Sequence, residues 1–168
     1  MPTNRLRPSA FVLAVAALVL GACTGTSAPT ATSTTDGTDP GIEFTFGAPA
    51  DPAEADRTVE IVASDDFRFD PATLTVVAGE TITFQIVNAG QDPHDFTLGD
   101  QVAQDEHEAE VADMGGTMMH DTANAVSVDA GETKELTWRF TQAGTVLIGC
   151  HQPGHYAAGM TGQITVQA

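Results

Sequence analysis

Residues 149–166 read "GCHQPGHYAAGMTGQITV" and place several metal-ligating side chains directly before an alternating segment. Cys150, His155 and Met160 follow one another at spacings of five and five, on what we expect to be one loop between two strands. A thiolate, an imidazole and a thioether form a soft ligand set that suits copper. Zinc suits the set less well, because a thioether is a poor zinc ligand. The stretch therefore predicts a copper site.

A mononuclear copper site of this kind needs a second imidazole from a distant strand. His94 is the obvious supplier, because it begins the strand-like segment of "NAGQDPHDFTLG", residues 88–99. Met160 is expected as a weak axial ligand that influences the reduction potential. Taken singly, Cys150 could be a small buried side chain, Met160 core filler and His155 a turn residue. Their joint spacing favours ligation.

The segment from Thr58 to the end of the chain has the pattern of an all-β domain. Apolar and polar residues alternate in "TVEIVAS", residues 58–64, and similar short runs follow, separated by glycine-containing turns. Seven or eight such strands predict a β-sandwich over residues 58–168. The exception is a long polar insertion at residues 98–123.

The chain before Thr58 has the composition of an export signal followed by a tether. Arg5, Arg7 and a short apolar core end in "LGAC", residues 20–23, which resembles the lipobox of bacterial lipoproteins. We therefore expect a signal peptide at residues 1–22 and an extracytoplasmic protein anchored to the cell membrane by lipid on Cys23. Ordinary secretion is the alternative. Residues 23–57 are predicted to be a flexible tether. For the part around Phe44 and Phe46, a short strand docked at the edge of a sheet is the alternative.

The charge and the cysteine count restrict the partners and the compartment. The chain has 6 Lys and Arg against 23 Asp and Glu, a formal charge of −17, which argues against binding to nucleic acid or anionic lipid. This negative charge fits binding to a basic partner protein. If Cys23 is acylated, Cys150 has no disulfide partner, and metal ligation would occupy its thiol.

The string CxxPGHxxxGMxG at residues 150–162, with His94 upstream, resembles the cupredoxins, or plastocyanin-like copper proteins. The resemblance covers about residues 58–168. It implies a Greek-key sandwich of about eight strands and one type 1 copper held by His94, Cys150, His155 and Met160. The segment "HDTANAVSVDAGETKELTWRFTQAG", residues 120–144, is similar to exported bacterial cupredoxins associated with copper tolerance and respiration.

The polar insertion contains further soft ligands. Thioethers favour Cu(I), so a second copper site is one interpretation, and packing over the open end of the sandwich is the other. The residues concerned are His107, Met114, Met118, Met119 and His120.

His151 beside Cys150 is reminiscent of multicopper oxidases, but the chain has no His-x-His pair for a trinuclear cluster. We therefore expect no oxidase, and we expect the His151 side chain to point away from the copper, because neighbouring strand residues face opposite sides.

The leading functional hypothesis is a small monomeric electron carrier, not an enzyme. Copper would exchange electrons through His155 with a basic redox partner such as a cytochrome or an oxidase. Small or apolar neighbours form the docking surface: Pro153, Gly154, Tyr156, Ala157 and Ala158. The alternative is a protein that buffers or delivers copper for copper tolerance.

The lipidation hypothesis predicts that Cys23→Ser releases the protein from the membrane fraction, because a single acylated residue supplies the anchor. Fractionation followed by mass spectrometry of the N-terminus tests this. Copper content should be unchanged, since Cys23 is not among the predicted ligands. A wild-type protein that is wholly soluble, with an unmodified N-terminus, would contradict the hypothesis.

Overall fold

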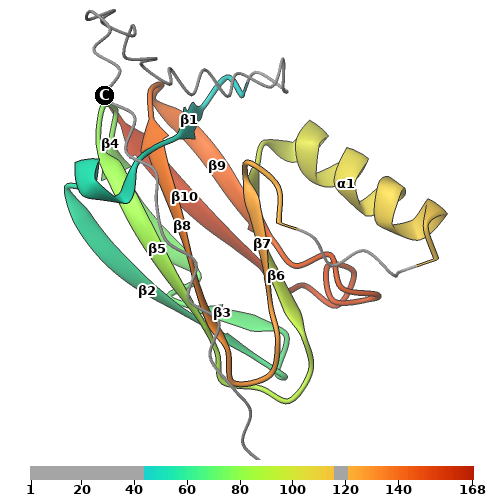
Figure 1. Cartoon of the computed structure of the whole chain (residues 1–168). Helices are drawn as coiled ribbons and strands as arrows, with labels where there is room; N and C mark the ends of the chain where they lie inside the picture. The colour runs from blue at the N-terminus through green and yellow to red at the C-terminus, as the bar shows by residue number, and fades with distance from the viewer. Residues whose placement is uncertain (1–43, 116–120) are drawn as a thin grey trace, which may run out of the picture. The chain divides into compact units, whose positions relative to one another are not determined.

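The computed structural model describes residues 44–115 and 121–168, which form two five-stranded sheets (Figure 1). The predicted signal peptide, most of the predicted tether, and Cys23, Met118, Met119 and His120 lie outside the described residues. The first sheet has the strand order β1-β8-β5-β2-β3 and the second has the order β4-β10-β9-β6-β7. The all-β sandwich predicted from the sequence is confirmed.

The strands of the first sheet are β1 (Gly47–Pro49), β2 (Arg57–Ser64), β3 (Arg68–Asp70), β5 (Thr81–Asn88) and β8 (Thr133–Phe140). Those of the second are β4 (Thr73–Val77), β6 (His94–Gly99), β7 (Ala125–Val128), β9 (Gly144–Gly149) and β10 (Thr161–Gln167). The described residues thus hold ten strands, where the sequence predicted seven or eight. Two of them, β1 and β3, are only three residues long, too short to show a period of two.

The core lies between the two sheets and is built from the inward positions of each strand. In β10, Ile164 and Val166 are buried, while the alternate residues Gln163, Thr165 and Gln167 are exposed. Strand β5 lies between β8 and β2, so Phe84 and its apolar neighbours are fully buried. Phe84 and Phe96 face each other from opposite sheets, with ring centroids 5.2 Å apart. This aromatic packing joins the sheets.

The N-terminal part of the described chain belongs to the domain. Strand β1 pairs antiparallel with β8, and a short 3-10 helix, η1 (Pro52–Glu54), leads into β2. The rings of Phe44 and Phe46 each lie 5.2 Å from that of Trp138. The part of the predicted tether from Phe44 onward therefore packs against the domain, and it forms the short edge strand that the sequence analysis gave as an alternative. Three aromatic rings outweigh the tether-like composition around them because they share one buried surface.

The polar insertion contains the one long helix of the described residues, α1 (Gln101–Asp113). Asp100 caps its N-terminus, with the carboxylate accepting a hydrogen bond from Ala103 N at 2.9 Å. The helix packs beside β6 and β9 and buries only Gln104 and Val111 (Figure 1). It is thus a surface helix held by few apolar contacts.

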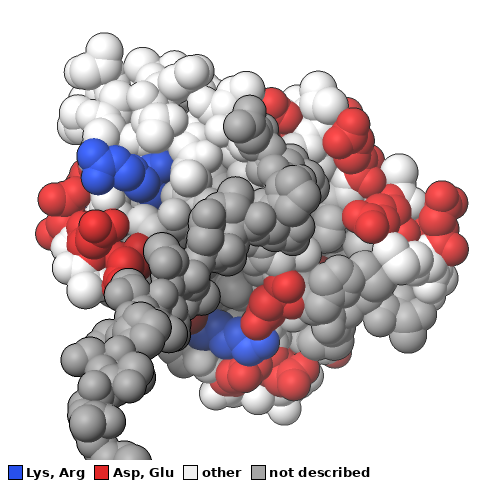
Figure 2. Space-filling view, turned by 45° about the horizontal axis from the view of Figure 1, so that its top comes forward, with Lys and Arg blue, Asp and Glu red and all other residues white. Residues whose placement is uncertain are grey.

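The surface of the domain is acidic. Figure 2 shows Asp and Glu side chains in several groups on one face, including α1, with fewer Lys and Arg side chains. Within the described residues, we find no helix with the length and apolar character needed to cross a membrane.

Phe46→Ala should lower the free energy of unfolding by about 3 kcal/mol, because it removes a buried ring stacked on Trp138. Chemical denaturation of the metal-free protein measures the effect. Val102→Ala is the matched control, because Val102 is exposed on α1 and alanine suits a helix, and it should change stability by less than about 0.5 kcal/mol. Equal stability of both variants would show that residues 44–57 are not part of the folded unit.

Candidate metal centre

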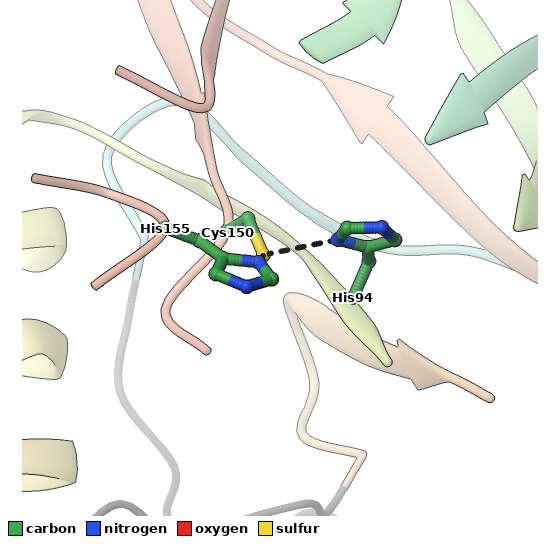
Figure 3. A group of neighbouring side chains, drawn as sticks. All are labelled: His94, Cys150 and His155. Carbon is green, nitrogen blue, oxygen red and sulfur yellow. Dashed lines mark hydrogen bonds between the residues drawn. The ribbon is translucent and has the colours of Figure 1, made fainter. Parts of the chain in front are cut away.

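Three side chains from two parts of the chain converge at one end of the sandwich (Figure 3). His94 begins β6, Cys150 directly follows β9, and His155 lies in the loop between β9 and β10. Cys150 Sγ is 3.4 Å from His155 Nδ1 and 3.9 Å from His94 Nδ1. The three candidate ligand atoms all lie within 4.8 Å of one another, so they could hold one metal ion.

The loop between β9 and β10 is shaped by hydrogen bonds across its base. Cys150 N donates to Met160 O at 3.1 Å, and Met160 N donates to His155 O at 3.0 Å. Gly154 and Gly159 adopt φ values of 83° and 93°, which only glycine tolerates readily. These two glycines allow the tight turns that bring Met160 back beside Cys150, where the loop begins.

Met160 is the predicted axial ligand, and its side chain is fully buried. Its backbone is bonded to both Cys150 and His155, which places the residue beside the other candidate ligands. Coordination by its thioether stays a prediction.

The thiol of Cys150 is shielded from water and is not exposed at all. Burial raises its pKa to about 12, although the backbone N–H of Asp95, 3.3 Å from Sγ, opposes this. Without a metal the thiol therefore keeps its proton at neutral pH. A bound cation would reverse this preference, because a coordinating thiol is deprotonated.

His155 is the half-buried member of the group and lies closest to solvent. Burial, followed by the neighbouring His94, lowers its pKa, so the ring is neutral and can ligate a metal. Around it, Pro153, Ala157 and Ala158 are exposed and Tyr156 is half-buried. The residues of the predicted docking surface are therefore accessible to a partner next to His155.

Comparison with known proteins fits this geometry. The family model for copper binding proteins of the plastocyanin/azurin family matches residues 57–167. The chain belongs to this family of cupredoxins. A thiolate and two imidazoles at these distances fit copper, and copper is confirmed as the cofactor of the family.

Relatives and solved structures agree with the assignment. The chain is 44% identical to the copper-resistant cuproprotein CopI of Rubrivivax gelatinosus, over 73% of each chain. It is 35% identical to CopI of Pseudomonas aeruginosa over 98% of each chain. A structure of auracyanin B is similar with a TM-score of 0.60 at 26% identity, covering 73% of this chain and 97% of that chain.

His151, the neighbour of Cys150 in this cupredoxin, is turned toward α1 and lies outside the group of candidate ligands, whereas the sequence predicted only that it points away from the copper. Its Nε2 lies 2.6 Å from Gln104 Oε1 and its Nδ1 lies 2.8 Å from Glu108 Oε2. Its ring also stacks on Tyr156, with centroids 4.7 Å apart. Both ring nitrogens are therefore occupied by protein groups, which leaves His151 unsuited to bind copper.

Gln104 ties the helix to the sheet and was missed by sequence reasoning. Its side chain is fully buried, and Nε2 donates to Thr97 O at 3.0 Å and to Leu147 O at 3.3 Å. Because the amide N–H groups of Gln104 are bonded to these two carbonyl oxygens, its Oε1 is the atom that accepts a hydrogen bond from His151 Nε2. No sequence signal marks a glutamine in a polar insertion as a buried residue.

The predicted second copper site is only partly within the described residues. His107 lies on α1 with its ring 4.7 Å from that of His151, and Met114 ends the helix with an exposed fraction of 40%. In the described part of the chain, His94, Cys150 and His155 form the one group of His, Cys, Asp or Glu side chains arranged for a metal. Cu(I) binding by the insertion stays a hypothesis.

A buried carboxylate links the two sides of the metal centre. Asp95 Oδ1 accepts from Ser127 Oγ at 2.6 Å and from Gln152 Nε2 at 2.9 Å. These bonds connect β6, β7 and the loop after Cys150, so they fix the distance between the strand of His94 and the ligand loop. The sequence did not indicate this network.

Adding Cu(II) to the metal-free protein at pH 8 should release about one proton per copper, because the Cys150 thiol must ionise to bind while imidazoles are ordinarily neutral there. The apparent affinity should accordingly rise by about tenfold per pH unit. Titration with a pH indicator measures the proton. Cys150→Ser should release none, and wild-type release near zero would mean that the thiol is already ionised.

Proposed function

We propose that this cupredoxin is a type 1 copper protein, with copper on His94, Cys150, His155 and Met160, that serves copper tolerance and is not an enzyme. The observation that carries the proposal is the match to a copper-resistant cuproprotein over 98% of both chains. The sequence alone ranked an electron carrier first. The copper-resistant relatives favour copper tolerance over electron transfer as the main function. The copper chemistry at the site is the same for both functions.

The geometry supports a copper that changes oxidation state without moving its ligands. His94 is held by the sheet, and the other three residues are held by one loop closed at its base. Such a frame limits rearrangement between Cu(I) and Cu(II). The edge of His155 is the route for electrons, because Cys150, Met160 and His94 are fully buried.

Partner and location follow from charge and from the N-terminal sequence. With 23 acidic and 6 basic residues, the chain suits a basic redox partner such as a cytochrome or an oxidase. The "LGAC" motif supports an extracytoplasmic protein held at the membrane by lipid on Cys23. Steering by charge implies that exchange with the partner slows as salt rises.

A dedicated electron carrier is the second candidate, and the partly exposed His155 with its rim of small residues favours it. Copper buffering by His107, Met114, Met118, Met119 and His120 is a variant of the tolerance function. It adds a Cu(I) site in the insertion and leaves the type 1 site unchanged.

Copper-loaded wild-type protein should absorb strongly in the visible range through Cu(II)–thiolate charge transfer, and Cys150→Ala should abolish the band. In cells that lack this protein, the wild type should restore growth at high copper and Cys150→Ala should not. Val102→Ala, at an exposed position of α1 outside the ligand set and the docking surface, is the control and should restore growth.

The second candidate predicts a different growth pattern. Loss of an electron carrier should slow respiratory growth at low copper as well as at high copper. A defect of that kind, with normal copper tolerance, would overturn the tolerance proposal while leaving the copper site intact.

A further inference from the structure

The turn between β2 and β3, residues Asp65–Phe67, contacts both histidines of the metal centre. Asp65 Oδ1 lies 3.4 Å from His94 Nε2. The ring centroid of Phe67 lies 4.8 Å from that of His155, with an interplanar angle of 60°. One short segment of the first sheet thus contacts the two imidazoles that come from the second sheet and its ligand loop.

His94 presents opposite ring nitrogens to the metal site and to this turn. Nδ1 faces Cys150 Sγ, so the buried Nε2 is the nitrogen left to carry the proton. Within the described residues Nε2 has no hydrogen-bond partner, and 3.4 Å to Asp65 exceeds the length of a well-formed N–H···O bond. A histidine that ligates a metal normally donates its second N–H to a carboxylate or carbonyl oxygen. Asp65 is the group placed to accept it.

The Asp65 carboxylate is held in place by the loop that leads to His94. It accepts hydrogen bonds from Gln91 N, at 2.8 and 3.1 Å, and from Asp92 N, at 3.2 Å. The packing is so close that a Cβ on Gly90 would clash with the carboxylate. Although its side chain is 41% exposed, Asp65 is therefore fixed relative to His94.

Phe67 is held in an unfavourable backbone conformation. Its φ is 57°, the left-handed region, which is rare for a bulky side chain. The turn is closed by a hydrogen bond from Phe67 N to Ser64 O at 3.0 Å. The ring is 37% exposed, yet it packs against His155. Strained residues of this kind cluster at functional sites, where the surrounding structure maintains them.

We propose that two residues of this turn position the ligands of the copper centre: Asp65 orients His94 and strengthens it as a donor, and Phe67 restrains the ring of His155. The inference rests on the proposed ligation by these two histidines. A stronger donor with an anion behind it stabilises Cu(II) more than Cu(I). The turn therefore lowers the reduction potential and slows the loss of copper.

Asp65→Asn tests the first role, because asparagine keeps the shape and an acceptor oxygen for Gln91 N but removes the charge. The ratio of Cu(II) to Cu(I) affinity should fall by about tenfold, which equals a rise of 59 mV for a one-electron couple. Asp66→Asn removes the same charge one residue along, at an exposed position, and should leave the potential nearly unchanged. Equal shifts in both variants, or no shift in Asp65→Asn, would overturn this role.

Phe67→Leu tests the second role through the rate at which Cu(II) passes to the chelator EDTA. The rate should rise several-fold in Phe67→Leu, whereas Phe67→Tyr keeps the ring and should behave as the wild type. A wild-type rate in Phe67→Leu would overturn the restraint on His155. Unfolding temperatures of the metal-free variants, expected to match the wild type, separate a local effect from a loss of fold.

The outcomes also separate this inference from the proposed function. A wild-type protein without a thiolate band would mean that the ligand set itself is wrong. A wild-type protein with the band, together with Asp65→Asn at the wild-type potential, would remove only the role of the turn.

Discussion

The antiparallel pairing of β9 with β10 is the constraint on which the metal centre depends. Gly149 is paired with Thr161, so the eleven residues between them must form a closed loop. The hydrogen bond from Cys150 N to Met160 O closes that loop at its first and last residues. Because a slip of one residue would turn every side chain to the other face, this register decides that Cys150 faces the other candidate ligands and His151 faces α1.

The position of β6 beside β9 supplies the rest of the site. Thr97 is paired with Gly149, which brings His94 to the end of the sheet where the ligand loop begins. The backbone N–H of Asp95 donates to Cys150 Sγ, and its carboxylate accepts from Gln152 in the ligand loop. A strand and a loop that are more than fifty residues apart in the sequence are thus held together by several hydrogen bonds around one sulfur atom.

Buried polar contacts also explain how a polar helix stays attached to the domain. Helix α1 buries few apolar atoms, but Gln104 uses its amide to bind Thr97 O, Leu147 O and His151. A buried amide without partners would cost about 1–3 kcal/mol, so a fully bonded one specifies a single position for the helix. Gly149 is required here, because a Cβ at that position would clash with Gln104. The helix and the ligand loop therefore share a set of contacts.

The sequence by itself determined the sandwich, the copper chemistry and the identity of the candidate ligands. These follow from local patterns: alternation marks strands, and the spacing of Cys150, His155 and Met160 lies within one loop. Only the tertiary structure decided that the segment around Phe46 packs on the sandwich and which residues support the ligands. Phe46 packs on Trp138, Asp65 faces His94, and Gln104 holds His151, and each pair is more than twenty residues apart. Such pairs depend on which strands become neighbours, and that is set by the packing of the whole sandwich.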